Sequence, residues 1–337
     1  MPATMKDIAA RSGVSIFTVS KYVNGGHVKN ENAEKIEAAV AELGYKVNTT
    51  ARALKTSRSM TIGIIMEELT NSFYSGVMSV VDNYFLESGY SSIITETKGR
   101  SEESLRKLDL LLSKRVDGII CFTSCCDLNF INTCIGSGVG LVVVDSLPQG
   151  GQPCGSCDFI LTDNVCGAFD ATRHLVENGH HEIAVITGDS SRFSAGERLR
   201  GYQECLAQSG IPVRGDLIFI DEYNIDGGYR CAQRLARLAR RPTAVLVCNY
   251  LMALGALVAF NENDLRAGEE LSLIMFDEIQ ANSAFRPRLT TVGQSLDEIG
   301  RLAAERILLR ARGGDLPDGI FRIPARLIIR DSVVRLK

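Results

Sequence analysis

From residue 61 onward, short apolar runs rich in β-branched residues alternate with longer segments of helical periodicity. The apolar runs predict strands at 61–66, 91–95, 118–122, 141–145, 159–162, 183–187, 217–220, 244–248 and 271–276. The helical segments are 72–88, 102–114, 165–178, 195–208, 226–239, 251–263 and 296–312. Such alternation is typical of parallel sheets covered by helices on both faces. Because about nine such units exceed one ordinary sheet, the pattern predicts an α/β body of two doubly wound lobes.

The first 45 residues follow a purely helical pattern. Two short helices are expected within residues 5–24, with Gly13 at the corner between them, where a positive φ is often needed. Thr4 and Asp7 have the spacing of a capping box at the start of the first helix. Ser15 can cap the second helix.

The second of these helices has two distinct faces. Val19 and Val23 are four residues apart and can face a small core, whereas Phe17 and Lys21 share a different face. With a third helix expected at 31–43, the segment has a helix-turn-helix pattern. In that motif the second helix can lie in the major groove of DNA.

The charge of the chain is unevenly distributed. Residues 1–58 carry nine Lys/Arg and five Asp/Glu, a balance of +4, so the total of −3 leaves −7 for the remainder. A basic head on an acidic body suits a head that meets DNA phosphates.

Length and composition add further expectations. The length of 337 residues predicts more than one domain, and the polar N-terminus predicts no signal peptide. The most apolar window, 243–260, contains Asn249 and Tyr250, so it predicts a buried strand and helix and no membrane span. Ten cysteines without a signal peptide indicate reduced thiols in the cytoplasm. Seven of them fall within 121–166, where we expect small buried hydrophobes and no metal site.

The catalytic motifs that we sought are missing from the sequence. There is no Gly-x-Ser-x-Gly elbow, no phosphate loop ending in Gly-Lys and no His-Glu-x-x-His. The glycine-rich segment 136–140 precedes a predicted strand, whereas a dinucleotide-binding loop follows one. We therefore expect no enzyme and no cofactor.

Candidate ligand-binding residues follow the predicted strands. Ligands of open α/β sheets bind outside the carboxyl ends of the strands. Polar or aromatic side chains just past those ends are Asn71, Phe73, Ser124, Asp145, Arg192, Arg198, Asn249 and Asp277.

Four short motifs in the head carry a family resemblance. Lys6-Asp-Ile-Ala9, Gly13-Val-Ser15, Thr18-Val-Ser-Lys21 and Val23-Asn-Gly25 resemble the DNA-binding head of the lactose-repressor/galactose-repressor (LacI/GalR) family. By that resemblance Ile16, Phe17 and Lys21 occupy operator-reading positions. The residues expected to contact operator DNA in the head are Thr4, Ser15, Ile16, Phe17, Thr18, Ser20, Lys21 and Asn24.

The resemblance extends to a hinge at 47–59. Asn48 would cap a short helix that orders on the operator, Ala51 would permit close approach and Leu54 would be an apolar wedge in the minor groove. Val47 departs from the proline usual in the family. A plain flexible linker is the alternative.

The resemblance also sharpens the ligand site. Arg198-Leu-Arg-Gly-Tyr202 matches the family's Arg-x-x-Gly-aromatic signature, and Asn249 and Asp277 match its Asn-Asp and Phe-Asp-Asp motifs. Tyr250 stands where Asp is common and offers a second stacking surface, while Met275 replaces a common Gly. The effector-binding residues expected are Asn71, Phe73, Ser124, Asp145, Arg198, Asn249, Tyr250 and Asp277.

Each candidate has a structural alternative. Asn249 and Asp277 could cap helices, and Arg198 could form a surface salt bridge. Asp145 could hold a contact between the lobes. Phe73 and Ile16 could be core residues of the body and of the head.

Together these observations predict a homodimeric, cytoplasmic transcription regulator that binds double-stranded operator DNA. Repression is the expected mode of action. A small polar effector, such as a sugar, is expected to bind the body. The alternative is a solute-binding protein of a transport system with the same two lobes. The predicted domains are the DNA-binding head at 1–46, the hinge at 47–59 and the effector-binding and dimerisation body at 60–337. By resemblance, lobe 1 spans about 60–160 and 292–320, and lobe 2 spans about 161–291 and 321–337.

Overall fold

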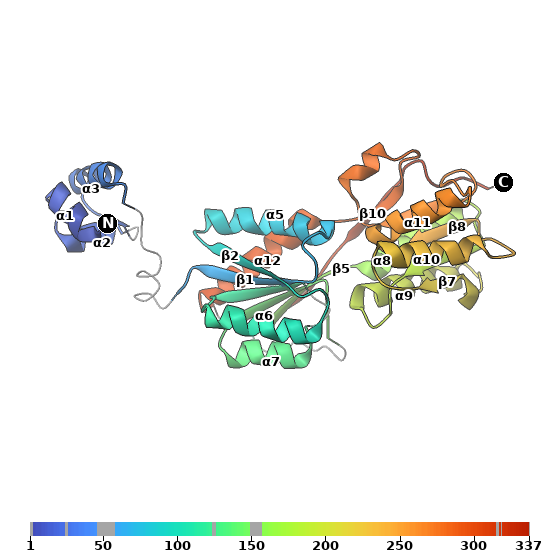
Figure 1. Cartoon of the computed structure of the whole chain (residues 1–337), viewed down its shortest axis with the longest axis horizontal. Helices are drawn as coiled ribbons and strands as arrows, with labels where there is room; N and C mark the ends of the chain where they lie inside the picture. The colour runs from blue at the N-terminus through green and yellow to red at the C-terminus, as the bar shows by residue number, and fades with distance from the viewer. Residues whose placement is uncertain are drawn as a thin grey trace. The chain divides into compact units, whose positions relative to one another are not determined.

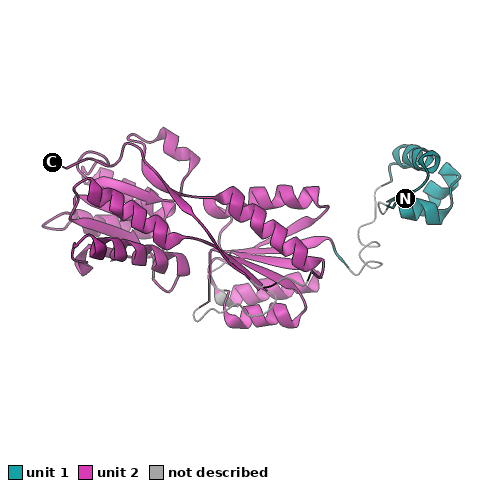
Figure 2. Cartoon of the chain, turned by 180° about the vertical axis from the view of Figure 1, so that it is seen from behind, with its two compact units in different colours: residues 1–59 teal, residues 60–337 magenta. Residues whose placement is uncertain are grey.

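The computed structural model describes residues 3–23, 26–45, 58–122, 126–148, 157–314, 317 and 319–336. The chain divides into two compact units, residues 1–59 and 60–337 (Figure 2). Across the described ranges, none of the helices combines the length and the apolar character that crossing a bilayer requires.

The described residues of the first unit form the helices α1 (Met5–Ser12), α2 (Ile16–Val23) and α3 (Asn30–Leu43). The predicted capping box is confirmed, because Thr4 Oγ1 accepts from Asp7 N and the Asp7 carboxylate accepts from Thr4 N. Gly13 has φ +67°, as the turn requires. A small core of Ile8, Val14, Val19, Ile36 and Ala39 holds the helices together.

In the second unit, the first lobe is built on a six-stranded parallel sheet (Figure 1). In spatial order its strands are β11 (Ile320–Ile323), β5 (Cys157–Thr162), β4 (Gly140–Val144), β3 (Gly118–Phe122), β1 (Thr61–Met66) and β2 (Ser91–Glu96). Helices α5 (Ser72–Glu87) and α12 (Leu296–Ala311) pack on one face. Helices α6 (Ser101–Ser113) and α7 (Leu128–Gly136) pack on the other.

The second lobe repeats this architecture. Its strands, in spatial order, are β12 (Ala325–Ile328), β10 (Thr290–Gln294), β9 (Ser272–Phe276), β8 (Ala244–Val247), β6 (Ile183–Thr187) and β7 (Ile218–Ile220). Only β12 runs antiparallel to its neighbour among these strands. One face carries α8 (Asn164–Glu177) and α9 (Phe193–Gln208), and the other carries α10 (Ile225–Ala236) and α11 (Tyr250–Glu262). Two short 3₁₀ turns occupy Gly215–Leu217 and Gln280–Ala284.

In the described residues the chain crosses between the lobes three times, each time within three residues of the approximate boundaries expected above. The first crossing follows β5 at Thr162. The second comes after Gln294, because all of β10 belongs to the second sheet rather than passing to lobe 1 at 292. The third follows Ile323, because Phe321 pairs with Ile160 in the first sheet. At each crossing a single residue separates the two elements: β5 leads into α8, β10 leads into α12 and β11 leads into β12. No long loop therefore marks these boundaries in the sequence.

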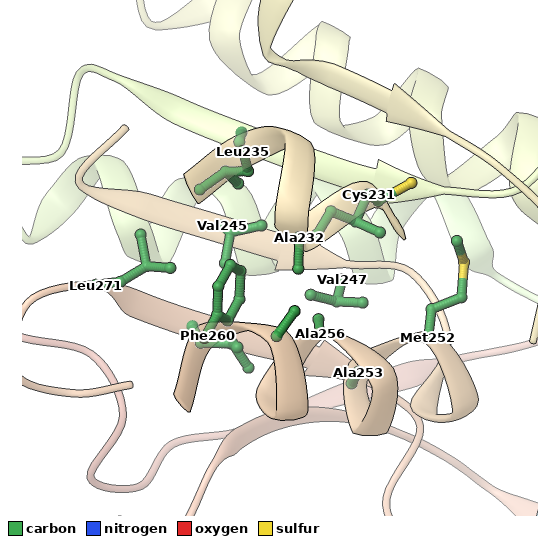
Figure 3. Packing of buried hydrophobic residues seen from close by; sticks show 14 of the residues in the cluster. Cys231, Ala232, Leu235, Val245, Val247, Met252, Ala253, Ala256, Phe260 and Leu271 are labelled. Atoms are coloured by element: carbon green, nitrogen blue, oxygen red, sulfur yellow. The ribbon is translucent and has the colours of Figure 1, made fainter. Parts of the chain in front are cut away.

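The paired helices α10 and α11 pack closely enough to require glycine. A Cβ on Gly255 would lie 1.9 Å from the carbonyl oxygen of Ile225, and one on Gly228 would lie 2.1 Å from that of Met252. This close approach seats Ala232 and Ala256 in the apolar layer between the helices and the sheet (Figure 3).

Gly255→Ala should therefore lower the free energy of unfolding of the body by about 1–3 kcal/mol or more, because backbone atoms must move. Urea unfolding followed by far-UV circular dichroism measures this change. Gly136→Ala is the matched control, because a Cβ there meets nothing within 4 Å and the helix gains propensity. Equal stability of the two variants would contradict the packing argument.

Candidate effector cleft and DNA-binding head

In the head, α2 presents the predicted DNA-contacting side chains to solvent. Phe17 is 77% exposed and Ile16 is 47% exposed, and Lys21 is exposed as well. The alternative of Ile16 as a core residue is therefore wrong. Ser15 caps the helix, because its Oγ accepts from Thr18 N at 3.2 Å.

The exposed apolar side chains of Phe17 and Ile16 lie on one short helix. Their exposure to water is unfavourable unless a partner covers them. Thr4 is engaged in its capping box, and Ser20 is partly buried. The predicted DNA contacts Asn24, Asn48, Ala51 and Leu54 lie outside the described residues, as does the predicted effector contact Ser124.

A cleft of about 420 Å³ lies between the lobes, at the carboxyl ends of strands from both sheets. Its lining side chains come from the segments after β1, β2, β4, β6, β7, β8 and β9 and from the ends of β3 and β10. Others come from the first turn of α5 and the first two turns of α9. Of the predicted effector residues, the cleft brings together Asn71, Phe73, Asp145, Arg198, Asn249 and Asp277.

Arg198 is the most strongly constrained side chain of the cleft. It is 2% exposed, so the alternative of a surface salt bridge is wrong. Its Nε donates to Asn164 Oδ1 at 2.7 Å, and its Nη1 donates to the carbonyl oxygen of Cys248 at 2.6 Å and to the Tyr223 hydroxyl at 3.0 Å. The guanidinium carbon lies 3.7 Å from the centre of the Phe276 ring.

The environment of Arg198 stabilises its charge despite burial. Burial alone would lower the pKa of the guanidinium, but Tyr223, Asp277 and Asp145 raise it above its usual value. The arginine therefore acts as a permanent cation at the base of the cleft.

Asp277 and Asn249 form a second buried group. Asp277 Oδ1 accepts from Gln294 Nε2 at 2.6 Å, and its Oδ2 accepts from the backbone of Tyr250 at 3.1 Å. Asn249 caps α11, because its Oδ1 accepts from Leu251 N at 2.9 Å. The capping alternative thus holds for Asn249, whose Nδ2 lies 3.5 Å from Asp277 Oδ2.

Asp145 lies across the cleft from Arg198, at the end of β4 in the other lobe. It has φ +56°, an uncommon conformation for a residue other than glycine, and its Oδ1 is buried without a hydrogen-bond partner. Burial raises the pKa of this carboxyl to about 6, and the attraction of Arg198 opposes the rise. Asp145 therefore lines the cleft and also interacts electrostatically between the lobes.

Tyr250 is not the stacking surface that we predicted. It does not line the cleft. Instead, its hydroxyl accepts from the backbone of Ser72 at 3.0 Å and donates to the carbonyl oxygen of Thr70 at 3.3 Å. Since Tyr250 begins α11 and Ser72 begins α5, this side chain joins the two lobes.

A second contact between the lobes joins Arg192 and Glu67. Arg192 Nη1 lies 2.8 Å from Glu67 Oε2, and the carboxylate is nearly buried. The lobes are thus held together by protein groups beside the cleft.

The aromatic residues of lobe 1 form one edge of the cleft. Phe73 is largely buried in the core of lobe 1 but also lines the cleft, so both interpretations apply. Its ring contacts Tyr74 edge-on at 5.6 Å, and Tyr74 lies 5.8 Å from Phe122. Asn71 caps α5, with its Oδ1 accepting from Phe73 N.

Several residues of this site are not among those predicted from the sequence. Tyr223 and Asp221 follow β7, so the rule of polar residues after strands could have found them. Gln294 ends a strand that the pattern did not predict. Tyr74 lies on the first turn of α5, and only the fold brings it to the cleft.

The cysteines of the described residues are free, and all but Cys166 are buried. Burial raises the pKa of Cys126, Cys134 and Cys248, which keeps the thiols protonated. Their role as small buried hydrophobes is confirmed for these residues.

A helix-turn-helix head and a two-lobed body with a polar cleft define the class of ligand-responsive DNA-binding regulators. Residues 4–48 match the model described as "Bacterial regulatory proteins, lacI family", and residues 172–333 match the "Periplasmic binding protein-like domain". The chain is 32% identical to the HTH-type transcriptional repressor PurR of Vibrio campbellii over 338 residues, 99% of each protein.

The chain is also 33% identical to the ribose operon repressor of Haemophilus influenzae, over 99% of this chain and 100% of that protein. Its fold matches the lac repressor dimer bound to operator and the anti-inducer ONPF, with a TM-score of 0.85, 28% identity, and coverage of 99% and 100%. The protein therefore belongs to the lacI family of bacterial regulatory proteins and is a transcriptional repressor of that family.

Asp145→Asn should stabilise the body at pH 8. Folding raises the pKa of this carboxyl from 3.8 to about 6. The protonated carboxyl is tolerated in the native state, but the ionised one destabilises it, so stability is lost as pH rises through 6. The expected gain is up to about 3 kcal/mol at pH 8 and shrinks as pH falls towards 4. Urea unfolding at several pH values measures it.

Asp189→Asn is the control for this prediction. Hydrogen bonds from the side chain and the backbone of Ser191 lower the pKa of the Asp189 carboxyl. Removal of this carboxyl should therefore not stabilise the body at pH 8. If Asp145→Asn gives no gain at pH 8, the raised pKa is refuted.

Proposed function

We propose that this repressor is controlled by a small polar effector, a sugar or sugar derivative, which binds in the cleft between the lobes and changes operator affinity. The observation that carries this proposal is the convergence of Arg198, Asp277 and Asp145 at the strand ends of two facing lobes. Hydroxyl groups both donate and accept, so a mixed set of cations, amides and carboxylates suits them.

Two structural neighbours support a sugar. A CelR–cellobiose complex matches with a TM-score of 0.75 and 26% identity, covering 98% of this chain and 99% of that one. A LacI family regulator from Enterococcus faecium with bound ribose matches with a TM-score of 0.74 and 26% identity, covering 82% and 100%. The alternative of a transport protein leaves the DNA-binding head without a role.

In the head, Ile16, Phe17 and Lys21 provide the operator-specific contacts. Lysine can donate to guanine O6 and N7, and Phe or Ile can pack on a thymine methyl group. The remaining polar residues predicted in the head position it on the phosphate backbone.

We further propose that the protein acts as a homodimer on a near-palindromic operator. Exposed apolar side chains lie on both lobes, with Leu86 and Ile94 in lobe 1 and Val258 and Ile225 in lobe 2. A second copy would cover such surface at a two-fold interface. Effector binding then shifts the dimer contact and biases the segment 47–59, provided that the ligand favours one state of the body.

Lys21→Ala should relax operator choice. Selection from a random duplex library, with binding measured at several salt concentrations, gives the preferred sequences and the salt slope. Lys29→Ala removes the same charge away from α2 and should reduce affinity without changing the preferred sequence. An unchanged preference in Lys21→Ala would refute its role in sequence recognition.

A sugar library screened by thermal shift on the full chain tests the effector site. Compounds that raise the melting temperature should change operator affinity in a gel shift, and Asp277→Ala should abolish that response while retaining operator binding. A response that survives Asp277→Ala would place the effector elsewhere. Asp264→Ala, a substitution outside the cleft lining, is the control.

A further inference from the structure

The lining of the cleft is strongly biased towards negative charge. Seven carboxylate side chains and three cationic side chains face it. The carboxylates are Glu67, Glu68, Asp145, Asp189, Asp221, Glu222 and Asp277. The cations are Lys98, Arg192 and Arg198. A cleft lined mainly by one sign of charge concentrates ligands of the opposite sign and repels those of the same sign.

Both arginines of the cleft are already engaged by protein groups. Arg198 donates to Asn164, Tyr223 and the carbonyl oxygen of Cys248, and its ring contact with Phe276 covers one face. Arg192 pairs with the nearly buried Glu67 of the opposite lobe at 2.8 Å. These contacts engage Nε and Nη1 of Arg198 and Nη1 of Arg192. An anion at either guanidinium would bind beside the carboxylates that already attract it, Asp145 and Asp277 at Arg198 and Glu67 at Arg192.

Lys98 does not reverse the bias. It is exposed and also borders a separate surface groove with Glu96 and Glu103, so its charge is shared with solvent and with other carboxylates. A phosphate group needs several convergent donors or a cation with free hydrogen-bonding capacity. The lining of this cleft supplies one exposed ammonium.

Four of the seven carboxylates are engaged by protein groups. Glu67 pairs with Arg192, Asp221 and Glu222 pair with Arg230, and Asp277 accepts from Gln294.

The other three carboxylates keep acceptor capacity towards the cleft. Asp145 has no hydrogen-bond donor at Oδ1, and Glu68 is exposed. Asp189 is exposed as well and accepts through one oxygen from Ser191 N. A ligand that donates more hydrogen bonds than it accepts therefore matches this lining.

One wall of the cleft favours a ring. The Tyr74 ring contacts those of Phe73 and Phe122, and all three residues line the cleft. Such a wall suits the apolar face of a cyclic ligand, while the carboxylates meet the groups at its edge.

We propose that the cleft selects an unphosphorylated, hydrogen-bond-donating ring, a neutral sugar or an amino sugar, and rejects ligands that carry phosphate or carboxylate groups. This inference rests on the effector site proposed above and adds the charge class of its ligand. The carboxylate excess, the engaged arginines and the aromatic wall each point to that class.

The sign of the potential can be measured without knowing the effector. A cysteine placed in the cleft by Asn224→Cys, in a Cys166→Ser background, reacts with two methanethiosulfonates of similar size, one carrying a trimethylammonium group and one a sulfonate group. The ratio of the two rates reports the local potential, because the reactivity of the thiol itself cancels. Reaction of the parent chain is subtracted.

Ser137→Cys, at the exposed end of α7 and outside the cleft lining, is the matched control. The cationic reagent should be favoured in the cleft by about tenfold or more over the control. A ratio equal to the control's, or one that favours the sulfonate, overturns the proposal. Because Asn224 caps α10, Ser146→Cys provides a second position in the lining, and circular dichroism checks that both variants fold.

Matched ligands separate this proposal from the effector proposal itself. Ribose and ribose 5-phosphate, and glucose, glucosamine and glucose 6-phosphate, are compared by thermal shift on the full chain. The proposed charge class is supported if a neutral or amino sugar stabilises the chain at a concentration at least tenfold lower than its phosphate ester does. Preferential stabilisation by a phosphate ester contradicts it. If no sugar binds, the proposal of a sugar effector is wrong. The ratio of the two methanethiosulfonate rates still gives the sign of the potential in the cleft.

Discussion

The buried guanidinium of Arg198 is the constraint on which the cleft depends. A cation in the interior is costly unless its donors are satisfied and counter-charges are near. Here Asn164 and the carbonyl oxygen of Cys248 accept its hydrogen bonds, and the Phe276 ring supports its face. These partners come from α8, from the end of β8 and from β9, so one side chain fixes the relative positions of three elements at the floor of the cleft.

The two lobes meet through contacts that flank this floor. The Tyr250 hydroxyl bonds to the first turn of α5, and Arg192 pairs with Glu67. Asp145 and Arg198 attract one another across the cleft. Because these contacts use protein groups alone, a ligand would act by changing their balance rather than by supplying the only link between the lobes. Such a change in relative stability is what a ligand must cause to shift a two-state equilibrium.

The fold was largely predictable because its elements are local. Apolar runs located the strands of both sheets, and the spacing of Thr4, Asp7 and Gly13 located the first helices. Helix α7 and strands β10 to β12 were missed: these elements are short, and β10 and β11 lie beside the crossings between lobes, where no long loop marks the boundary.

The site was only partly predictable from the sequence. Residues that follow strands directly, such as Asp145 and Asp277, could be found from topology alone. The role of Tyr250 could not be predicted, because its partner Ser72 lies far away in the sequence. Nor could the sequence show that the protein engages Nε and Nη1 of Arg198, which depends on where the fold places Asn164, Tyr223 and the carbonyl oxygen of Cys248.

The exchange of the Arg198 Nε proton with water tests this account most directly. Selective ¹⁵N-arginine labelling of the full chain gives one Nε–H signal per arginine, and the Arg198→Lys variant assigns the signal of interest by its loss. The account predicts exchange much slower than that of an exposed arginine such as Arg106, together with a ring-current shift from Phe276. Exchange as fast as that of Arg106 would contradict the claim that the protein itself holds this cation.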